Sequence, residues 1–348
     1  MLDASVTACF AAGPGYLNTA SVGLPARATM AALRRAHDAW EAGLCDPVGF
    51  DADVDRSRRA FARLAGTDAA NVALIGQVST ASGLVASSLP DGATVVCAEE
   101  DFTSVLFPFL VDERLKVRMV PLDALVDEIG RGTDLVAVSA VQSADGRVLD
   151  LDRLADAAAD VGARTYVDAT QAAGWLRLDT DRFDVTATGA YKWLCAPRGT
   201  GFLTVAPQAE WLIPRHAGWY AGDQPWESIY GPPLRLAADA RRFNVSPPWF
   251  DVVGTAPALE LLADLGVKAV GSHSVALANH FRAGVGLGPS DSAIVRVPTA
   301  QTDAAAAAFR EAGVAAAVRA GGVRLSFYVY NTLADADLAA DVVRSVQQ

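Results

Sequence analysis

The chain has little of what membrane-spanning and nucleic-acid-binding proteins require. Its 348 residues contain no uninterrupted apolar run of about 18 residues, the length that would indicate a membrane-spanning helix. Basic residues are in the minority, with 29 Lys and Arg against 40 Asp and Glu and a net charge of −11. Because nucleic acids and anionic membranes attract basic patches, we expect neither as a partner. No basic stretch precedes the first apolar residues, so we expect no signal peptide.

Cysteine and histidine are also scarce. The four cysteines, Cys9, Cys45, Cys97 and Cys195, lie far apart without CxxC spacing. This pattern is typical of reduced, mostly buried thiols, so we expect a cytoplasmic protein. The four histidines form no HExxH motif or other cluster of ligands, and we predict no metal site.

What the chain has in quantity is apolar sequence, at 51% of its residues, enough for a large core. Short apolar runs alternate with helical patterns between about residues 70 and 205, the helices being clearest at 80–88 and 151–161. This alternation predicts an α/β fold, with a mostly parallel sheet flanked by helices. We expect strands at 72–75, 94–97, 117–120, 135–138, 165–167, 184–187 and 201–205.

The pattern changes near Pro248, where a long helical region begins. Short strands then alternate with helices, which predicts a smaller C-terminal α+β domain with an antiparallel sheet. We therefore expect a large domain over residues 16–248 and a small domain over 249–348 together with 1–15. Residues 211–250 are rich in aromatic residues, glycine and proline, which favours an ordered loop region.

Lys192 lies in an unusual position, between the β-branched run 185–188 and a Gly- and Pro-rich turn that precedes another apolar run. Lysine is seldom fully buried, and its amine becomes nucleophilic when its pKa falls. Lys192 is therefore a candidate to form a Schiff base, although a surface lysine on a turn would give the same pattern.

A second signal lies 24 residues upstream, where the expected strand 165–167 ends at Asp168. Ligands collect at the carboxyl ends of strands in open α/β sheets. An aspartate there can pair with the protonated pyridine nitrogen of pyridoxal phosphate (PLP) and make the ring an electron sink. Gln171, three residues later, could reach the phenolic oxygen of the same ring. The alternative is an N-cap aspartate with an unrelated lysine.

Asp168, Gln171 and Lys192 in this order resemble the class V aminotransferase family of PLP enzymes, which includes cysteine desulfurases, kynureninase, isopenicillin epimerases and carbon–sulfur lyases. The resemblance runs from about Tyr16 to Asp337. It implies PLP fold type I, PLP as the cofactor, and Lys192 as the catalytic residue that carries it.

The resemblance also implies the remaining cofactor contacts. Val78, Ser79 and Thr80 follow a strand and open a helix, where backbone N–H groups attract phosphate, although an ordinary N-cap fits equally. Phe102 would stack on the pyridine ring, as in kynureninase, and the Tyr191 hydroxyl would bind the phosphate. Two contacts are less well matched. Ser143 stands where the family often has asparagine, and Ser246 belongs to a segment that reaches the partner's phosphate across a dimer interface, which implies a homodimer with shared active sites.

The expected partner is a small amino-acid substrate. Arg324 lies in Val323–Thr332, which resembles the family's Arg-(x)-Ser…Tyr-Asn-Thr signature, where arginine grips the α-carboxylate in a planar fork. Ala20 and Ser21 would lie near the substrate. Trp219 and Tyr220 could hold a trimethylammonium group by cation–π attraction, or could instead pack a dimer interface.

The positions of the cysteines narrow the choice of reaction. Cysteine desulfurases need a cysteine shortly before the carboxylate-binding arginine. No cysteine follows Cys195 in this sequence, which disfavours a desulfurase. Kynureninase is disfavoured because it has histidine where this chain has Gln171. A β-elimination remains, with Lys192 as general base. The whole-chain pattern resembles the lyases of ergothioneine biosynthesis that cleave hercynylcysteine sulfoxide. An aminotransferase or epimerase of the same family is the alternative, and a non-catalytic binding protein is a third.

Overall fold

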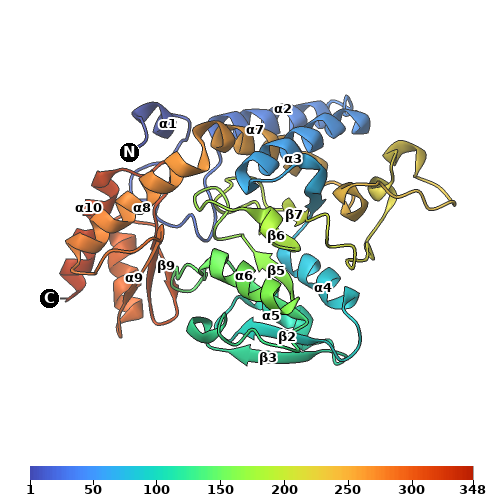
Figure 1. The fold of residues 1–348 in the computed structure, drawn as a ribbon. Helices are drawn as coiled ribbons and strands as arrows, with labels where there is room; N and C mark the ends of the chain where they lie inside the picture. The colour runs from blue at the N-terminus through green and yellow to red at the C-terminus, as the bar shows by residue number, and fades with distance from the viewer. Residues whose placement is uncertain (348) are drawn as a thin grey trace.

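Seven strands form one central sheet in the computed structural model, which describes residues 1–347 (Figure 1). The sheet order is β1-β7-β6-β5-β4-β2-β3. The neighbours from β6 to β3 run parallel, whereas β7 is antiparallel to both β1 and β6. The strands are β1 (Val72–Ile75), β2 (Thr94–Ala98), β3 (Lys116–Val120), β4 (Leu135–Ser139), β5 (Arg164–Asp168), β6 (Val185–Gly189) and β7 (Gly201–Val205).

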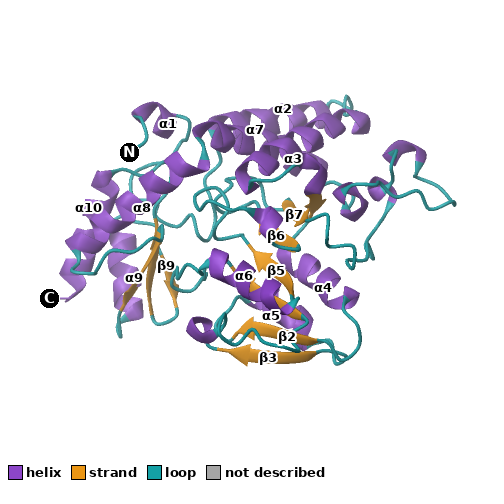
Figure 2. Cartoon of the chain, viewed as in Figure 1, coloured by secondary structure: helices purple, strands orange, loops and turns teal. Residues whose placement is uncertain are grey.

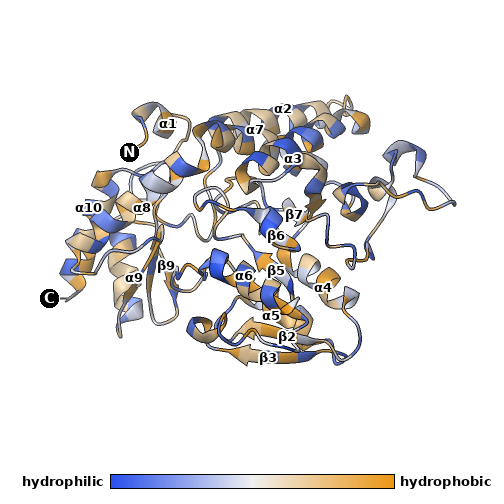
Figure 3. Cartoon of the chain, viewed as in Figure 1, coloured by the Kyte–Doolittle hydropathy of each residue, from blue (hydrophilic) through white to orange (hydrophobic). Residues whose placement is uncertain are grey.

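Helices cover both faces of this sheet, because successive side chains of each strand point to opposite sides. On one face Val72, Leu74 and Val136 pack with α3 (Asp51–Ala65), α6 (Leu151–Val161) and α7 (Trp249–Leu265). On the other, Ala73, Ile75 and Leu135 pack with α4 (Val78–Ser88) and α5 (Thr103–Leu110). Figure 2 shows these layers, and Figure 3 shows apolar residues concentrated in the strands between them. The α/β prediction with a mostly parallel sheet is therefore confirmed.

The C-terminal part contains a second, antiparallel sheet in the order β8-β10-β9. Its strands are β8 (Ile294–Pro298), β9 (Ala317–Arg319) and β10 (Gly322–Ser326). One face packs against α8 (Val267–Gly284), α9 (Thr302–Glu311) and α10 (Leu333–Gln347) through a core that includes Val295, Val323 and Leu325. This is the smaller α+β unit that the sequence predicts.

The remaining elements lie before the sheet or in its connections. Two helices, α1 (Ala4–Ala8) and α2 (Arg27–Glu41), precede α3, and α2 packs against α7. Residues 211–250 form loops with three short 3-10 turns, η5 (Trp219–Ala221), η6 (Pro225–Glu227) and η7 (Ala240–Phe243), in agreement with the expected ordered loop region. Other 3-10 turns are η1 (Pro47–Phe50), η2 (Ala69–Asn71), η3 (Leu122–Ala124) and η4 (Thr180–Arg182). The predicted change of pattern near Pro248 coincides with the start of α7; the domain boundaries remain a prediction.

Across residues 1–347, no helix combines the length and the apolar character that crossing a membrane would take. Within the same range, no three or more His, Cys, Asp and Glu side chains group as metal ligands would.

Candidate active site

A cavity of about 410 Å³ lies at the carboxyl ends of the central strands. Four segments line it: the turn from β1 into α4, the start of α5, the end of β5, and the loop between β6 and β7. The sheet order places β5 next to β6, so Asp168 at the end of β5 and Lys192 just after β6 enter the same space. Both residues were singled out from the sequence, and the fold brings them together.

Lys192 is buried in this cavity, with 6% of its surface exposed. Its Nζ atom lies 5.3 Å from the centre of the Phe102 ring and 5.6 Å from that of Tyr191. Burial lowers the pKa of Lys192 to about 8, and the opposing attraction of Asp168 does not cancel the effect. A substantial fraction of the amine is therefore neutral near physiological pH, as a nucleophile or general base requires.

Asp168 is also buried, and burial raises the pKa of its carboxyl group to about 6. Its Oδ1 accepts the backbone N–H of Thr170 at 2.8 Å, and the Thr170 hydroxyl in turn accepts the N–H of Gly189 at 2.9 Å. These bonds fix the ends of β5 and β6 relative to each other. A buried carboxyl group held this way stabilises a cationic partner well, because little water competes for it.

A separate part of the cavity lining is suited to an anion. α4 begins at Val78, and its N-cap Gln77 makes no side-chain bond to the first turn, so the backbone N–H groups there remain free of such a cap. Val78 lines the cavity, while Ser79 and Thr80 lie in the first helical turn outside the lining. The Arg198 guanidinium adds positive charge, 5.3 Å from the centre of the Tyr191 ring. Helix N-terminus and arginine together form an anion cradle.

The predicted substrate residues meet in an adjoining network of hydrogen bonds. Arg324 on β10 is 2% exposed; its Nη2 donates to Ser21 Oγ at 2.8 Å and its Nη1 to Ser143 Oγ at 3.1 Å. Burial lowers the pKa of Arg324 to about 10, and the group stays positively charged at neutral pH. The structure thus joins the N-terminal segment, the loop after β4 and the small sheet around one guanidinium.

Gln171 belongs to the same network. Its amide nitrogen donates to the Ala20 carbonyl and to Ser143 Oγ, both at 3.0 Å, and its oxygen accepts the indole N–H of Trp193 at 2.7 Å. These contacts use both ends of the amide. The contact of Gln171 with a ring oxygen therefore remains a prediction.

Three predicted residues lie elsewhere in the chain. The Tyr220 hydroxyl donates to Asp51 at 2.7 Å, and Trp219 packs on Tyr220 with ring centres 5.1 Å apart, outside the residues that line the Lys192 cavity. Ser246 is exposed and also lies outside that lining. Within one copy of the chain, these three residues do not join Lys192.

The sequence reasoning did not identify Ser104, Thr170 and Arg198, which also line the cavity. Thr170 could have been inferred from the sequence, since it lies two residues after Asp168, at which the strand ends. No sequence feature indicated Arg198, because an arginine in a Gly- and Pro-rich turn is ordinarily a surface residue.

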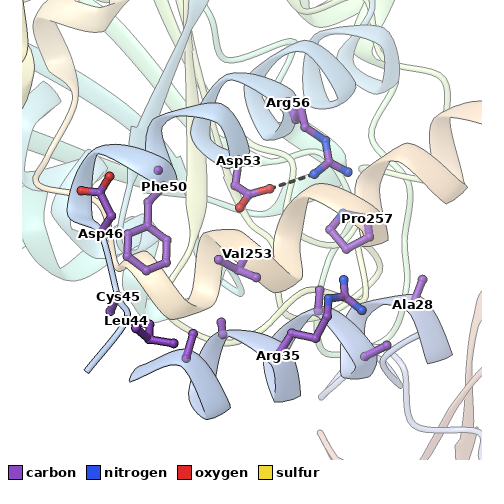
Figure 4. A pocket seen from close by; sticks show the side chains of 15 residues that line it. Ala28, Arg35, Leu44, Cys45, Asp46, Phe50, Asp53, Arg56, Val253 and Pro257 are labelled. Carbon is purple, nitrogen blue, oxygen red and sulfur yellow. Dashed lines mark hydrogen bonds and ion pairs between the residues drawn. The ribbon is translucent and has the colours of Figure 1, made fainter. Parts of the chain in front are cut away.

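A larger hollow of about 610 Å³ is lined by residues of α2, α3 and α7 (Figure 4). Its walls are mainly alanine side chains of α2 together with Val253 and Pro257. Arg56 is already paired there with Asp53 at 2.8 Å and with Glu260 at 2.6 Å. This hollow contains no lysine, so we assign the chemistry to the smaller cavity.

The residues around Lys192 fit PLP. The buried amine, the buried carboxyl group and the helix start with Arg198 supply the three groups that an aldehyde, a pyridine nitrogen and a phosphate require, and Phe102 supplies an apolar ring. Comparison with known proteins agrees. The aminotransferase class-V family profile matches residues 52–318, and the chain belongs to this family. The predicted family, enzyme class and PLP cofactor are thereby confirmed.

Several relatives show how broad that family is. The chain is 28% identical to an uncharacterized aminotransferase, YcbU of Bacillus subtilis, covering 82% of each chain. It is 31% identical to isopenicillin N epimerase of Streptomyces clavuligerus, over 65% of this chain and 63% of that protein.

Solved structures share the fold at lower identity. The Escherichia coli cysteine desulfurase CsdA superposes with a TM-score of 0.85 at 21% identity, covering 100% of this chain and 99% of the other. The cystine C-S lyase C-DES, solved in complex with its product cysteine persulfide, gives 0.83 at 18% identity, covering 95% and 97%.

Proposed function

We propose that the chain is a PLP-dependent carbon–sulfur β-lyase that acts on the sulfoxide of a cysteine S-conjugate. The observation that carries this proposal is the Lys192–Asp168 pair in one cavity beside the Arg324 network, with no cysteine among the residues that line the cavity. When bound, PLP supplies an electron sink for the charge that develops at the substrate Cα.

Each residue of the site has a separate role in the proposed reaction. The Arg324 guanidinium binds the α-carboxylate and orients the amino acid. Lys192, whose pKa is lowered by burial to about 8, removes the proton from Cα in its neutral form. Asp168 holds positive charge at the far side of the cavity. Phe102 places an apolar ring beside the reacting centre, with its centre 5.3 Å from Lys192 Nζ.

Thiol chemistry is disfavoured. The last cysteine in the sequence, Cys195, is 2% exposed, and burial strongly raises the pKa of its thiol. A thiolate nucleophile needs a lowered pKa and access to the substrate. The departing sulfur must therefore leave without attack by a protein thiol. A sulfoxide meets this demand, because the Cβ–S bond breaks with its electron pair moving to a sulfur that leaves as a sulfenic acid.

Within this class we propose hercynylcysteine sulfoxide as the substrate, in ergothioneine biosynthesis. The support is the resemblance of Phe102–Pro108, Val141–Gly146 and Gly218–Gly222 to the lyases of that pathway. The trimethylammonium group of hercynine has no N–H to donate, and aromatic faces recognise such cations at about 0.5–2 kcal/mol each. Trp219 and Tyr220 are the proposed aromatic contacts. Because they lie outside the Lys192 cavity of their own chain, this role requires that they serve the site of a partner.

We further propose a homodimer with shared active sites, in which Ser246 reaches the partner's phosphate. Ser246 is exposed at the end of a segment anchored to β1 by the Asn244 side chain, which accepts the Leu74 N–H at 2.7 Å. A rigid anchor followed by an exposed hydroxyl is what a contact to a second copy requires.

The test is pyruvate release from a panel of cysteine S-conjugates and their sulfoxides. A β-lyase forms pyruvate and ammonia from them without a second substrate. An aminotransferase, the second candidate, would convert them to the S-substituted 2-oxo acid, and only with a keto-acid acceptor, and an epimerase would invert Cα instead. The similarity to isopenicillin N epimerase is the reason to test for epimerase activity as well. Inversion without pyruvate would rule out the lyase.

A further inference from the structure

Three arginines share one face of the small sheet. In antiparallel strands, directly opposed residues point to the same side, and residues two apart on one strand do so too. Arg324 on β10 is opposite Arg296 on β8 and Ala317 on β9, while Arg319 is opposite Gly322, two residues before Arg324. Arg296, Arg319 and Arg324 therefore lie on the same face.

This face looks toward the active site and away from the helices. Ser326 lies on it, opposite Ile294, and its hydroxyl accepts the Ala20 N–H at 3.0 Å, beside the Ser21 that binds Arg324. The other face, with Val323 and Leu325, is buried against the helical layer. The arginine face is thus the wall of the small sheet that carries Arg324 and its bonds to Ser21 and Ser143, and Arg319 is exposed on it.

The charge on this wall is not compensated within residues 1–347. Arg319 donates only to its neighbour's carbonyl, Val318 O, at 2.7 Å, and Arg296 only to Gly321 O at 3.4 Å, with no Asp or Glu of the described chain in ion-pair range. The Nε atoms of Arg296 and Arg324 are buried without a partner in that same part of the chain. Repulsion from Arg319 contributes to the lowered pKa of both Lys192 and Arg324. Guanidinium groups gathered this way favour an anionic or strongly dipolar oxygen ligand.

We propose that Arg319, with Arg296 beside it, binds a second oxygen acceptor on the side chain of the substrate, while Arg324 binds the α-carboxylate. The inference rests on the proposed amino-acid lyase and deepens it. It restricts the substrate class to amino acids whose β-substituent carries an S-oxide oxygen or a distal carboxylate. Substrates with a plain thioether lack this contact.

Binding of unreactive ligands tests the proposal independently of turnover. Three α-methyl amino acids, which have no Cα proton to lose, are titrated calorimetrically into the holoenzyme: α-methyl-S-methylcysteine, its sulfoxide, and α-methyl-S-carboxymethylcysteine. The variants are Arg319→Gln and Arg296→Gln. Arg310→Gln is the matched control, because Arg310 is an exposed arginine of α9, in the helical layer behind the sheet.

We expect the wild type to bind the sulfoxide or the carboxymethyl ligand about tenfold more tightly than the thioether. Arg319→Gln should abolish that preference, Arg296→Gln should reduce it, and Arg310→Gln should leave it unchanged. Loss confined to the sulfoxide identifies the S-oxide as the acceptor, and loss confined to the carboxymethyl ligand identifies a distal carboxylate. Equal binding of all three ligands by the wild type, or equal losses for all three in Arg319→Gln, would overturn the proposal. If the preference depends on Arg319 but no substrate yields pyruvate, the lyase assignment fails and the binding inference stands.

Discussion

At the scale of single residues, the site depends on two groups whose ionisation is shifted in opposite directions by the same cause. Burial lowers the pKa of Lys192 to about 8 and raises that of Asp168 to about 6. Burial thereby favours the neutral form of each group. Charge is restored when a cationic ring nitrogen pairs with the carboxylate, so the two groups form a site that is complete only with its cofactor.

The first prediction is that Lys192 is the lysine that carries PLP. It is the lysine that lines the cavity with Asp168, and burial lowers the pKa of its amine to about 8. Borohydride reduction followed by peptide mapping should place the pyridoxyl group on Lys192, and Lys192→Ala should abolish both the label and activity. Labelling of Lys116 or Lys268 would contradict the assignment.

The second prediction concerns Asp168 and the stability of the cofactor-free chain. The folded pKa, about 6, exceeds the ordinary value of 3.8, so the folded state holds this proton more tightly than the unfolded chain. Stability from this group is present below pH 3.8 and is lost as the pH rises through about 6. The loss is about 3 kcal/mol at most, by the equivalence of about 1.4 kcal/mol per pKa unit.

Asp168→Asn removes this titration while keeping the shape of the side chain. In urea unfolding of the cofactor-free proteins, the free energy of unfolding of the variant should therefore rise relative to that of the wild type between pH 4.5 and pH 7.5. Thr186 provides a control, since Thr186→Val removes a buried hydroxyl of β6 that pairs with Thr204 without removing a charge. A wild-type-to-variant difference that is the same at both pH values would disprove the shift.

At the scale of elements, the loop after β6 is held in place by the N-terminal segment. The Gly23 N–H donates to the Tyr191 carbonyl at 2.9 Å, and a Cβ atom at position 23 would lie 1.9 Å from the Lys192 carbonyl oxygen. Backbone meets backbone at this point, and no flexible side chain can move aside. The position of Lys192 therefore depends on a residue far away in the sequence.

The third prediction is that Gly23→Ala displaces this loop. We expect a loss of about 1–3 kcal/mol in unfolding free energy, the usual range for overpacking, together with weaker PLP binding. Gly13→Ala is the matched control, because nothing lies within 4 Å of a Cβ atom there. The two measurements are urea unfolding and the PLP dissociation constant. Identical behaviour of the two variants would show that the close approach does not hold the lysine.

The same elements show why the fold was more predictable than the site. β1 and β7 begin and end where expected, since continuous apolar runs bounded by turn residues leave little choice. α5 was not assigned from sequence, because it is short, apolar throughout and interrupted by Pro108. The arginine face could not be predicted from the sequence. The side of the sheet on which Arg319 lies depends on which residue of β10 it opposes, and a single sequence does not reveal that register.

At the scale of the whole molecule, the proposed homodimer makes a prediction that no monomer can satisfy. Lys192→Ala, inactive alone, and Ser246→Ala, weak alone, should partly regain activity when they are mixed, dissociated and reassembled. Some mixed dimers then contain one site with neither defect. Activity is compared with that of each variant treated alone. A monomer by sedimentation, or no regain after mixing, would refute shared active sites.

The bonds that Arg324 makes to Ser21 and Ser143 have a consequence for the resting enzyme. An incoming carboxylate meets a guanidinium whose donors are already engaged, so it must compete with the protein's own hydroxyl and carbonyl groups for them. Binding is an exchange of partners, and its free energy is the difference between two sets of similar bonds. Common cellular carboxylates therefore gain little from this guanidinium alone, and further contacts of the substrate must supply the selectivity of binding.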